Sequence, residues 1–465
     1  MIRFPVFPVV FFVLCVLLLQ VRIHLDKNLI EQLPDLPQTP FADRSLGQRN
    51  LVNPRLERQL RRGTERCPDL QRPAESEIRT RHEVWQYHES DTKEEVVVYS
   101  AFFDDRPLLD LSTWIRILGV ASIPSKQVFC YVWYDGYTKP YVIAGQLNVT
   151  GREHGYRYGN RSFIQYLISC QLPGVEPVPS HVSLVTVECN QSSIFLPVQR
   201  PIRSTPDQEF GICVPISFGT VSTQDFVEWI ELNRLFGVTE FNIYDANMTG
   251  MSDVFDYYST RGLLRVFRTP PAVNLLDLGG VKLGSVVALN DCMMRNLYRY
   301  RMIIVIDFDE FIIPRIHNDY SSMLAHVDKA AKQTEHYQGY AFRNAYFFRE
   351  LAADATEPSY LRTAFHRLRS ALKKEAVSPK SFVDPRFCLS VFNHYCLLQL
   401  KPGKLRSIDV HPSLAVTHHY RICGFSKPRC AEYYNASYRD DTGLRFKDRV
   451  LPRVKLALKE LRVLP

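Results

Sequence analysis

The sequence has no Cys-x-x-Cys pair, although it contains 11 cysteines in 465 residues. Zinc ribbons and thioredoxin-type redox sites are built on such pairs, so their absence argues against both. Cys15 lies in an apolar run near the N-terminus, and ten cysteines follow that run. An even number suits disulfides in an oxidising compartment. The spacing does not decide which cysteines pair.

The apolar run between Arg3 and Arg22 is not followed by the small residues of a cleavage site. It has eighteen uncharged residues, close to the number that crosses a bilayer, and LLLQVRIH at its end has no A-x-A-like pattern. We therefore expect residues 1–25 to be a short cytoplasmic tail and a signal anchor. Five N-x-S/T sequons favour a lumenal, glycosylated body on a single-pass type II membrane protein: Asn148, Asn160, Asn190, Asn247 and Asn435.

Acidic residues are outnumbered, with 49 Asp and Glu against 57 Lys and Arg and a net charge of +8. Two basic clusters, Arg55–Arg66 and Arg362–Lys374, do not interleave aromatic residues with glycine as an RNA-binding module does, which argues against nucleic acid as a partner. We interpret both clusters as solvated basic faces. The alternative is a surface that favours an anionic substrate or membrane headgroups.

Local patterns divide the rest of the chain into a stem and two folded regions. Residues 26–90 are rich in Pro, Arg, Gln and Glu, as in a stem or linker. Residues 91–207 carry runs of β-branched and aromatic residues between turn formers, which predict a β-rich region. From residue 208, strand-like and helix-like runs alternate up to a strand at residues 302–314. This alternation predicts βαβ units and a parallel sheet.

Three acids, Asp307, Asp309 and Glu310, interrupt the aliphatic run IIVIDFDEFIIP. Ligands of parallel sheets bind at the carboxyl ends of the strands. In an extended segment, Asp307 and Asp309 point to one side and Glu310 to the other. Two carboxylates presented together suit Mn²⁺ or Mg²⁺, which can bridge to a diphosphate. The alternative is that the acids only begin a polar turn.

Four stretches occur in order between Cys213 and Arg421: FVEWIELNRLFGVTEFNIYDAN, YYSTRGLLRVF, LNDCMMRNLYRYRMIIVIDFDEFIIP and HHYR. Together they resemble glycosyltransferase family 92, once called domain of unknown function 23. The family occurs in type II Golgi enzymes that include β-1,4-galactosyltransferases. The resemblance implies a GT-A fold over residues 208–465, an α/β, Rossmann-like, mostly parallel sheet with helices on both faces. It also implies a nucleotide-sugar donor, bound through its diphosphate and a divalent cation.

By this resemblance, Asp307 and Asp309 match the metal and diphosphate motif. GT-A enzymes often add a late histidine to the metal ligands, and His418 and His419 are the candidates, since neutral imidazole suits Mn²⁺. Adjacent residues of a strand point to opposite faces, so at most one of the two is a ligand.

The resemblance also suggests donor-binding residues. Asp245, at the end of the second strand, would contact the nucleoside, unless it only forms a turn. Three further candidates precede the strand that carries Asp307 and Asp309, and they would lie near the donor sugar or phosphate: Asn290, Asp291 and Arg295. The alternative is that Asp291 and Arg295, four residues apart, only pair on the helix surface.

Inverting transfer needs a carboxylate that deprotonates the acceptor hydroxyl. Glu350 and Asp384 follow the metal strand and are candidates. Glu310 is a third, although a supporting role beside the metal ligands suits it better.

The sequence thus predicts a Golgi glycosyltransferase that moves galactose from UDP-galactose onto a glycan or glycoprotein acceptor with inversion. Phosphohydrolases of the haloacid dehalogenase type also carry D-x-D after an aliphatic strand, but at the start of their domain, whereas several βα units precede it here. The remaining alternative is a non-catalytic, membrane-tethered glycan-binding protein. The intact D-x-D with a late histidine argues against it.

Overall fold

All described residues belong to one compact unit, Asn53–Pro465. The expected signal anchor, most of the expected stem and the sequon at Asn160 lie outside the described residues. Within the described ranges, no helix is long and apolar enough to cross a membrane. The computed structural model describes residues 57–58, 65–73, 85–89, 95–109, 112–122, 127–151, 156–158, 161–174, 177–201, 203, 205–206, 208–268, 278–331, 337–375, 377–403 and 407–464.

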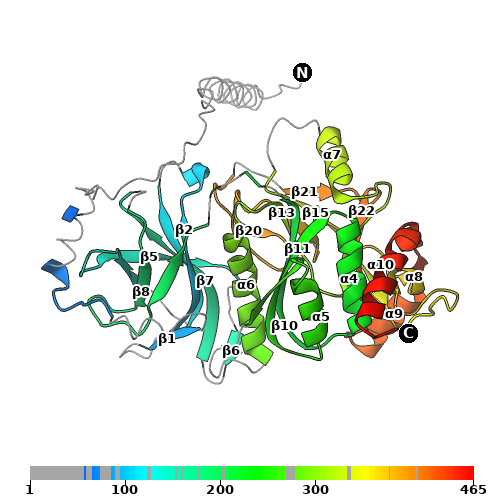
Figure 1. Cartoon of the computed structure of the whole chain (residues 1–465), viewed down its shortest axis with the longest axis horizontal. Coiled ribbons are helices and arrows are strands. Elements are labelled where there is room, and N and C mark those ends of the chain that lie inside the picture. Colours follow the sequence, from blue (N-terminus) through cyan, green and yellow to red (C-terminus); the bar gives the residue numbers. More distant parts are fainter. Residues whose placement is uncertain are drawn as a thin grey trace, which may run out of the picture. The chain divides into compact units, whose positions relative to one another are not determined.

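The N-terminal β-rich region is a sheet that closes on itself, shown at the left of Figure 1. The strands at the two ends of the ring's spatial order, given below, pair in parallel with each other and close the ring. The other pairings are antiparallel. The side chains that fill it include Val96, Val98, Ile115 and Ile117. In spatial order the ring consists of β2 (Glu95–Asp104), β3 (Trp114–Ser122), β7 (Arg161–Gln171), β5 (Tyr141–Val149), β4 (Val128–Trp133), β8 (His181–Val185) and β9 (Leu196–Gln199), while β1 (Gln86–Glu89) pairs with β2 and β6 (Tyr156–Tyr158) with β7.

The second region is built on a seven-stranded sheet that begins as the sequence predicts. Its first four strands are parallel: β12 (Leu264–Arg268), β11 (Val238–Thr249), β10 (Gln208–Thr220) and β13 (Tyr300–Val305). The helices between them are α4 (Thr223–Leu235), α5 (Ser252–Ser259) and α6 (Leu278–Arg295).

The expected GT-A, Rossmann-like and mostly parallel fold is wrong, because the sheet becomes mixed after β13. Strand β18 (Lys380–Val383) runs antiparallel to β13, β15 (Gly339–Phe342) runs antiparallel to β18, and β21 (Ser407–Val410) runs parallel to β15. The segment predicted as one strand at residues 302–314 breaks after Val305. Its second half, β14 (Glu310–Pro314), joins a separate mixed sheet with β22 (Ala415–Arg421) and β16 (Asn344–Phe348).

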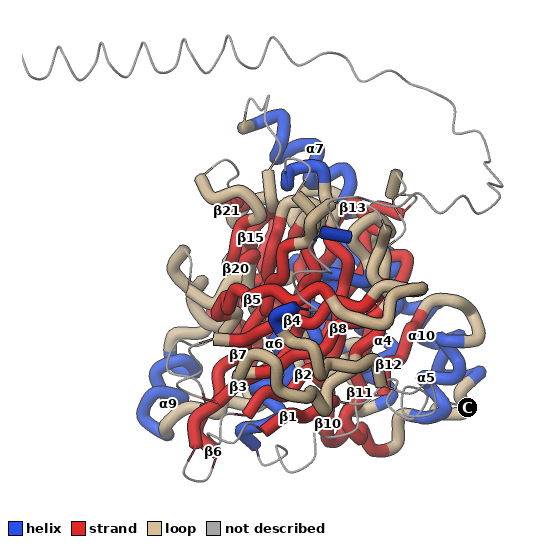
Figure 2. The backbone as a smooth tube through the Cα atoms, turned by 90° about the vertical axis from the view of Figure 1, so that its left-hand side faces the viewer, coloured by secondary structure: helices blue, strands red, loops and turns tan. Residues whose placement is uncertain are grey.

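The remaining elements, most of them after β14, lie around these sheets. Strands fill most of the interior, and α5, α7 and α9 lie toward the periphery (Figure 2). The remaining elements are η1 (Pro107–Leu109), α7 (Tyr320–Ala330), α8 (Arg362–Phe365), β17 (Leu368–Arg369) paired with β23 (Tyr438–Arg439), β19 (Cys388–Val391) paired with β20 (Cys396–Gln399), α9 (Lys427–Asn435), η2 (Thr442–Phe446) and α10 (Lys447–Glu460).

Helix α6 lies between the closed sheet and the seven-stranded sheet (Figure 1). One hydrophobic core joins all three, with Leu118 and Leu167 from the closed sheet, Met293 from α6 and Ile303 from β13. Helix α4 belongs to the other large core, together with α10. These two cores hold the carboxyl ends of β10 and β13 in fixed positions, and the candidate site lies there.

Candidate functional site

An open cavity of about 530 Å³ lies where β10 and β13 end. This volume is within the usual range for small-molecule sites. The lining residues come from three places: the end of β10 with the start of α4, the turn between β13 and β14, and the segments near β16, α8 and β22. They are Val214, Ile216, Ser217, Phe218, Thr220, Val221, Ser222, Asp225, Asp307, Phe308, Asp309, Arg349, Arg362, Tyr420, Arg421 and Ile422.

The three acids of the aliphatic run lie in a turn and not in an extended strand. The Glu310 amide donates to the Asp307 carbonyl over 3.1 Å. Asp307 and Asp309 line the cavity, whereas Glu310 is buried and accepts from the Asp307 amide at 3.0 Å. Phe308, between the two aspartates, packs edge-on against Trp229 of α4. The turn therefore presents the two aspartates to the cavity and buries Glu310 beneath them.

The buried side chain of Lys380 forms ion pairs with two of these acids, Asp307 and Glu310. Its ammonium lies 2.8 Å from Asp307 Oδ2 and 2.7 Å from Glu310 Oε2, and its side chain is 2% exposed. Burial by itself lowers the pKa of a lysine, but the two carboxylates outweigh it and raise the pKa of Lys380. Burial also raises the pKa of Glu310 above its ordinary value, despite the nearby Lys380 charge. Lys380 therefore remains a cation, and it serves as the charged partner of Asp307.

The two adjacent histidines have different surroundings. His419 Nε2 lies 3.1 Å from Asp309 Oδ2, and its Nδ1 lies 3.2 Å from Glu310 Oε1. Burial alone lowers the pKa of His419, but Glu310 and Asp309 outweigh it and raise that pKa. His418 is fully buried and stacks on Phe347 with ring centroids 4.2 Å apart. Burial lowers the pKa of His418 to about 3. His419 is therefore the histidine beside the cavity acids.

The donor set at this wall of the cavity fits a divalent cation. Carboxylate oxygens and an imidazole nitrogen are ligands that Mn²⁺ accepts. Among the residues that the structure describes, no three His, Cys, Asp or Glu side chains form a ready-made metal cluster. Cations that work with phosphates are often held by only one or two protein carboxylates, with phosphate oxygens and waters completing the shell. Asp309 supplies such a carboxylate, His419 Nε2 lies 3.1 Å from it as the nitrogen donor, and Asp307 lies on the same turn.

Arginines supply the positive charge of the cavity. Arg362 is 3% exposed and donates from Nη2 to the Asp225 carbonyl at 2.8 Å and to the Phe308 carbonyl at 2.9 Å. Arg349 Nη1 donates to Asp225 Oδ2 over 2.9 Å, and Arg421 completes the set. The interpretation of the whole Arg362–Lys374 cluster as a solvated face is therefore wrong at its first residue.

Glu228 of α4 is the reason why Arg362 is buried. The Glu228 carboxylate is 0% exposed and accepts four hydrogen bonds, from the Arg362 amide and Nε and from the Thr363 amide and hydroxyl. A buried carboxylate needs such partners, and the basic segment supplies them. Glu228 was missed at the sequence level, although an acid between the apolar Val227 and Trp229 of one helix is a usable signal.

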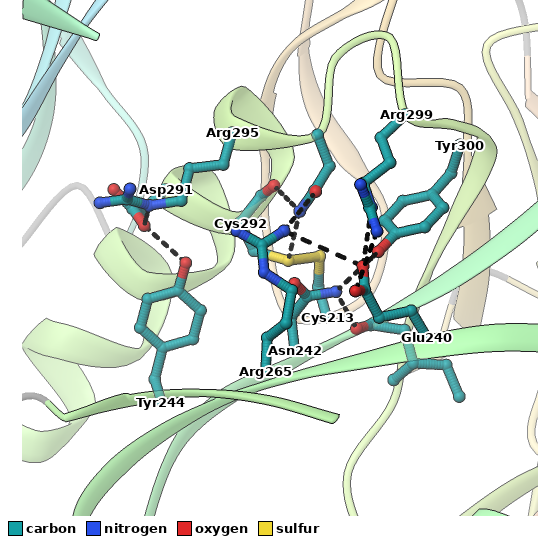
Figure 3. Close-up of a disulfide and its surroundings, with 12 residues drawn as sticks. Cys213, Glu240, Asn242, Tyr244, Arg265, Asp291, Cys292, Arg295, Arg299 and Tyr300 are labelled. Atoms are coloured by element: carbon teal, nitrogen blue, oxygen red, sulfur yellow. Dashed lines mark hydrogen bonds and ion pairs between the residues drawn. A yellow bond between two sulfur atoms is a disulfide. The ribbon is translucent and has the colours of Figure 1, made fainter. Parts of the chain in front are cut away.

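The candidate donor-binding residues of α6 lie outside the cavity lining. Asn290 is buried. Its Nδ2 donates to the Val391 carbonyl and its Oδ1 accepts from the Val391 amide, at 2.8 Å each. Asp291 accepts from Tyr244 Oη and from Arg295 Nε, each over 2.5 Å (Figure 3). The Asp291–Arg295 pair is thus the one that the alternative interpretation predicted, but Asp291 is buried beneath the helix surface.

Asp245 also lies next to the cavity and not in its lining. It pairs in the sheet with Ser217, which does line the cavity. Its carboxylate accepts from the Met248 amide over 2.7 Å, in a turn where Asn247 has a φ of 71°. Asp245 therefore forms a turn one strand away from the lining of the cavity.

The three candidate bases differ in accessibility. Asp384 is buried and accepts from Arg386 Nε at 2.9 Å and Nη2 at 2.5 Å. Glu310 is held by Lys380 and His419. Glu350 is exposed, follows the cavity residue Arg349, and accepts from the Cys423 amide at 2.8 Å. Of the three acids, Glu350 is the one that solvent reaches beside the cavity.

Of the predicted glycosylation sites, Asn247 and Asn435 are exposed, whereas Asn148 and Asn190 are half-buried. The ten cysteines after the apolar run form five disulfides, which confirms the expectation of disulfide bonding. The pairs are Cys67–Cys189, Cys130–Cys170, Cys213–Cys292, Cys388–Cys396 and Cys423–Cys430.

Comparison with solved structures gives weak similarity only. One chain, titled "Crystal Structure of a Mycobacterial Protein", is 12% identical with a TM-score of 0.19, over 31% of this chain and 42% of that one. This chain thus spans less than half of that structure's length. Glucosyl-3-phosphoglycerate synthase from Mycobacterium tuberculosis, in complex with phosphoglyceric acid, is 11% identical with a TM-score of 0.24, over 49% of this chain and 77% of that one. Such scores support no conclusion about fold or function.

Comparison with curated proteins finds no match. The family comparison does find one: residues 208–452 match the sequence model of glycosyltransferase family 92. This match contains the turn at Asp307–Asp309, His419 and every residue that lines the cavity. Because it spans more than half of the 465 residues, the chain belongs to glycosyltransferase family 92, which indicates an enzyme that transfers a sugar from a donor to a glycan acceptor.

Proposed function

We propose that this protein is a metal-dependent glycosyltransferase that moves galactose from UDP-galactose onto a glycan acceptor with inversion. The observation that carries the proposal is the charge arrangement of the cavity. Asp307 and Asp309 lie on one turn, and Arg349, Arg362 and Arg421 line the same space. The diphosphate of a nucleotide-sugar gains negative charge as the sugar leaves, and positive groups such as these arginines stabilise that charge.

Asp309 and His419 would hold the divalent cation, Mn²⁺ or a related ion. When bound, such an ion supplies a positive charge that stabilises the leaving diphosphate. Lys380 keeps Glu310 and Asp307 in place beside them, since its ammonium contacts both carboxylates. Arg362 fixes the turn itself, because it donates to the carbonyl of the residue between the two aspartates.

Glu350 is the base that we propose among the three candidates. Inversion in a single displacement needs a carboxylate that takes the proton of the acceptor hydroxyl as the new glycosidic bond forms. Glu350 is exposed beside Arg349 and Cys423, so an acceptor entering from solvent would reach it. The carboxylates of Asp384 and Glu310 are buried, and each is held by a basic partner.

We also propose that the protein resides in the Golgi membrane with its folded unit in the lumen. The support is the five disulfides, which are typical of an oxidising compartment. Exposed Asn247 and Asn435 would be glycosylated there. Loss of mass on treatment with an N-glycosidase checks that the folded unit is lumenal, and an unchanged mass contradicts it.

The activity test uses the full chain in detergent with Mn²⁺, a glycan array and a panel of UDP-sugars. We expect UDP release to be fastest with UDP-galactose, to stop on addition of EDTA and to fall sharply in Asp309→Asn. Asp256→Asn, on an exposed position of α5, is the matched control. NMR of the product would give the anomeric configuration.

The outcomes separate the parts of the proposal. Release that persists in Asp309→Asn or in EDTA removes the metal role. A different preferred donor removes galactose, and a retained anomer removes inversion. The absence of release with every donor and acceptor removes the transferase proposal and favours a non-catalytic glycan-binding protein.

A further inference from the structure

Two large apolar side chains of the cavity are exposed. Phe218 is 51% exposed and Ile422 is 69% exposed, and both line the same space. They come from different sheets, since Phe218 lies in β10 and Ile422 directly follows β22. Single exposed apolar residues are ordinary on a protein surface. Two from separate elements in one cavity are better explained by a ligand that covers them.

The backbone beside Phe218 is irregular, two residues before the end of β10. Gly219 has a φ of 78°, a conformation that other residues rarely adopt. The pairing of β10 with β11 shifts register between Ser217 and Gly219. Earlier residues of the strand, such as Ile212 and Val214, are buried. Phe218 is therefore held at the exposed end of a central strand whose first part lies in the core.

The lining of the cavity divides by charge. The continuous stretch Val214–Ser222 contributes apolar groups and the hydroxyls of Ser217, Thr220 and Ser222, and it contains no ionisable residue. The ionisable lining residues lie outside this stretch: Asp225, Asp307, Asp309, Arg349, Arg362, Tyr420 and Arg421. A ligand that matches both parts has a flat, uncharged ring with polar edges at one end and an anionic group at the other.

We infer that Phe218, with Ile422, forms the subsite for the base of a nucleoside diphosphate. The base stacks on the Phe218 ring, its polar edge meets the hydroxyls of the β10–α4 stretch, and the diphosphate extends toward Arg362 and Asp309. This inference rests on the proposed function and names the part of the donor that the uncharged wall recognises. Aromatic stacking suits a base because each base has a π-face.

The test measures equilibrium binding to the full chain by calorimetry in the presence of Mn²⁺. The probes are UDP, uridine and inorganic pyrophosphate. We expect Phe218→Ala to weaken binding of UDP and of uridine about tenfold to a hundredfold, and to leave pyrophosphate binding unchanged. Phe218→Tyr keeps the ring and should bind UDP as the wild type does. Ile422→Ala should weaken UDP binding by a smaller factor, and Ile316→Ala, at a residue 56% exposed outside the cavity, should have no effect.

Several results would overturn the inference. If Phe218→Ala weakens UDP and pyrophosphate equally, the change acts through the whole cavity and not through a base. If it leaves UDP binding intact but weakens binding to a glycan array, the ring belongs to the acceptor. If the wild type binds no uridine nucleotide, this inference and the proposed donor fail together. If it binds UDP with the expected Phe218 dependence but transfers no sugar, the subsite stands and the proposed function fails.

Discussion

Arg362 donates to the carbonyl oxygen of Phe308 over 2.9 Å, and Phe308 is the residue between the two cavity aspartates. The same guanidinium donates from Nε to the buried carboxylate of Glu228 at 3.1 Å. On the other side of the turn, Trp229 Nε1 donates to the Glu310 carbonyl at 3.1 Å. Helix α4 therefore holds the turn directly through Trp229 and indirectly through Glu228 and Arg362.

Arg362→Met should lower the free energy of unfolding by about 3–5 kcal/mol, because it leaves the Glu228 carboxylate buried without its cation. The turn should also loosen, so UDP release should fall as well. Urea unfolding and the UDP-release assay measure both effects. Arg449→Met, at an exposed position of α10, is the control. Equal stability of the two variants would contradict the role of Arg362.

Lys380→Met should also destabilise the protein by about 3–5 kcal/mol, since the buried carboxylate of Glu310 then loses its lysine partner. The loss of stability caused by Lys380→Met should be smaller when Glu310→Gln is also present, because the second substitution removes the carboxylate that lost its lysine partner. Urea unfolding of the two single variants and the double variant gives the coupling energy. Lys374→Met changes an exposed lysine and should be neutral. Additive effects of the two substitutions would show that the Lys380–Glu310 contact carries no stability.

The sequence predicts where the site lies better than it predicts which residues form it. The aliphatic run before Asp307 correctly indicates a buried strand that ends at acids, because that pattern is local. It does not reveal the turn, since IIVIDFDEFIIP is equally compatible with one continuous strand. Lys380 and Glu228 escape prediction because their partners, Asp307 and Arg362, are 73 and 134 residues away in the chain. No local periodicity records such pairs.

The fold shows the same limit. Strands β10 to β13 are correctly predicted as parallel, because the helices between consecutive strands imply crossovers. The error begins with β15 and β18, two four-residue strands in a part of the chain without helical alternation. Neither GYAF nor KSFV indicates which neighbour it joins or in which direction. The mixed character of the sheet is therefore decided by packing against residues that are distant in sequence.

The two adjacent histidines should respond differently to substitution. His419→Gln should weaken Mn²⁺-dependent UDP binding with little loss of stability, because His419 contacts Asp309 at the cavity. His418→Ala should lower the free energy of unfolding by about 2–4 kcal/mol, because it leaves a void beside Phe347. Calorimetric titration and urea unfolding distinguish the two effects. Stronger loss of metal-dependent binding in the His418 variant would reverse the assignment.

Asp104 should make stability depend on acid pH. It is fully buried and accepts from Arg106 Nε and Arg116 Nε at 2.8 Å each. Burial alone raises the pKa of a carboxyl, but the two arginines outweigh it and hold the pKa of Asp104 well below its ordinary value. A lowered pKa stabilises the fold above the unfolded pKa of about 4, and this contribution is lost as the pH falls toward the folded pKa.

We therefore expect the free energy of unfolding to fall as the pH drops from about 5 to about 3, and to fall less steeply in Asp104→Asn. That variant should already be weaker at neutral pH, because Arg106 and Arg116 lose their charged partner. Urea unfolding across this pH range makes the comparison, with Asp256→Asn as an exposed control. Parallel pH profiles for wild type and Asp104→Asn would rule out this carboxylate as a source of the acid sensitivity.

Two disulfides of different loop length should contribute unequally. Cys213–Cys292 links β10 to α6 across 79 residues, whereas Cys423–Cys430 closes a loop of 7 residues beside the cavity. Loop-closure entropy alone gives about 4.5 kcal/mol for the first and about 2.4 kcal/mol for the second. Replacing both cysteines of a pair by alanine should follow that order in urea unfolding. The smaller loop begins one residue after Ile422, so its removal should also weaken UDP binding, whereas removal of Cys213–Cys292 should act chiefly on stability. Equal stability losses, or UDP binding that only the long-range pair affects, would contradict this division.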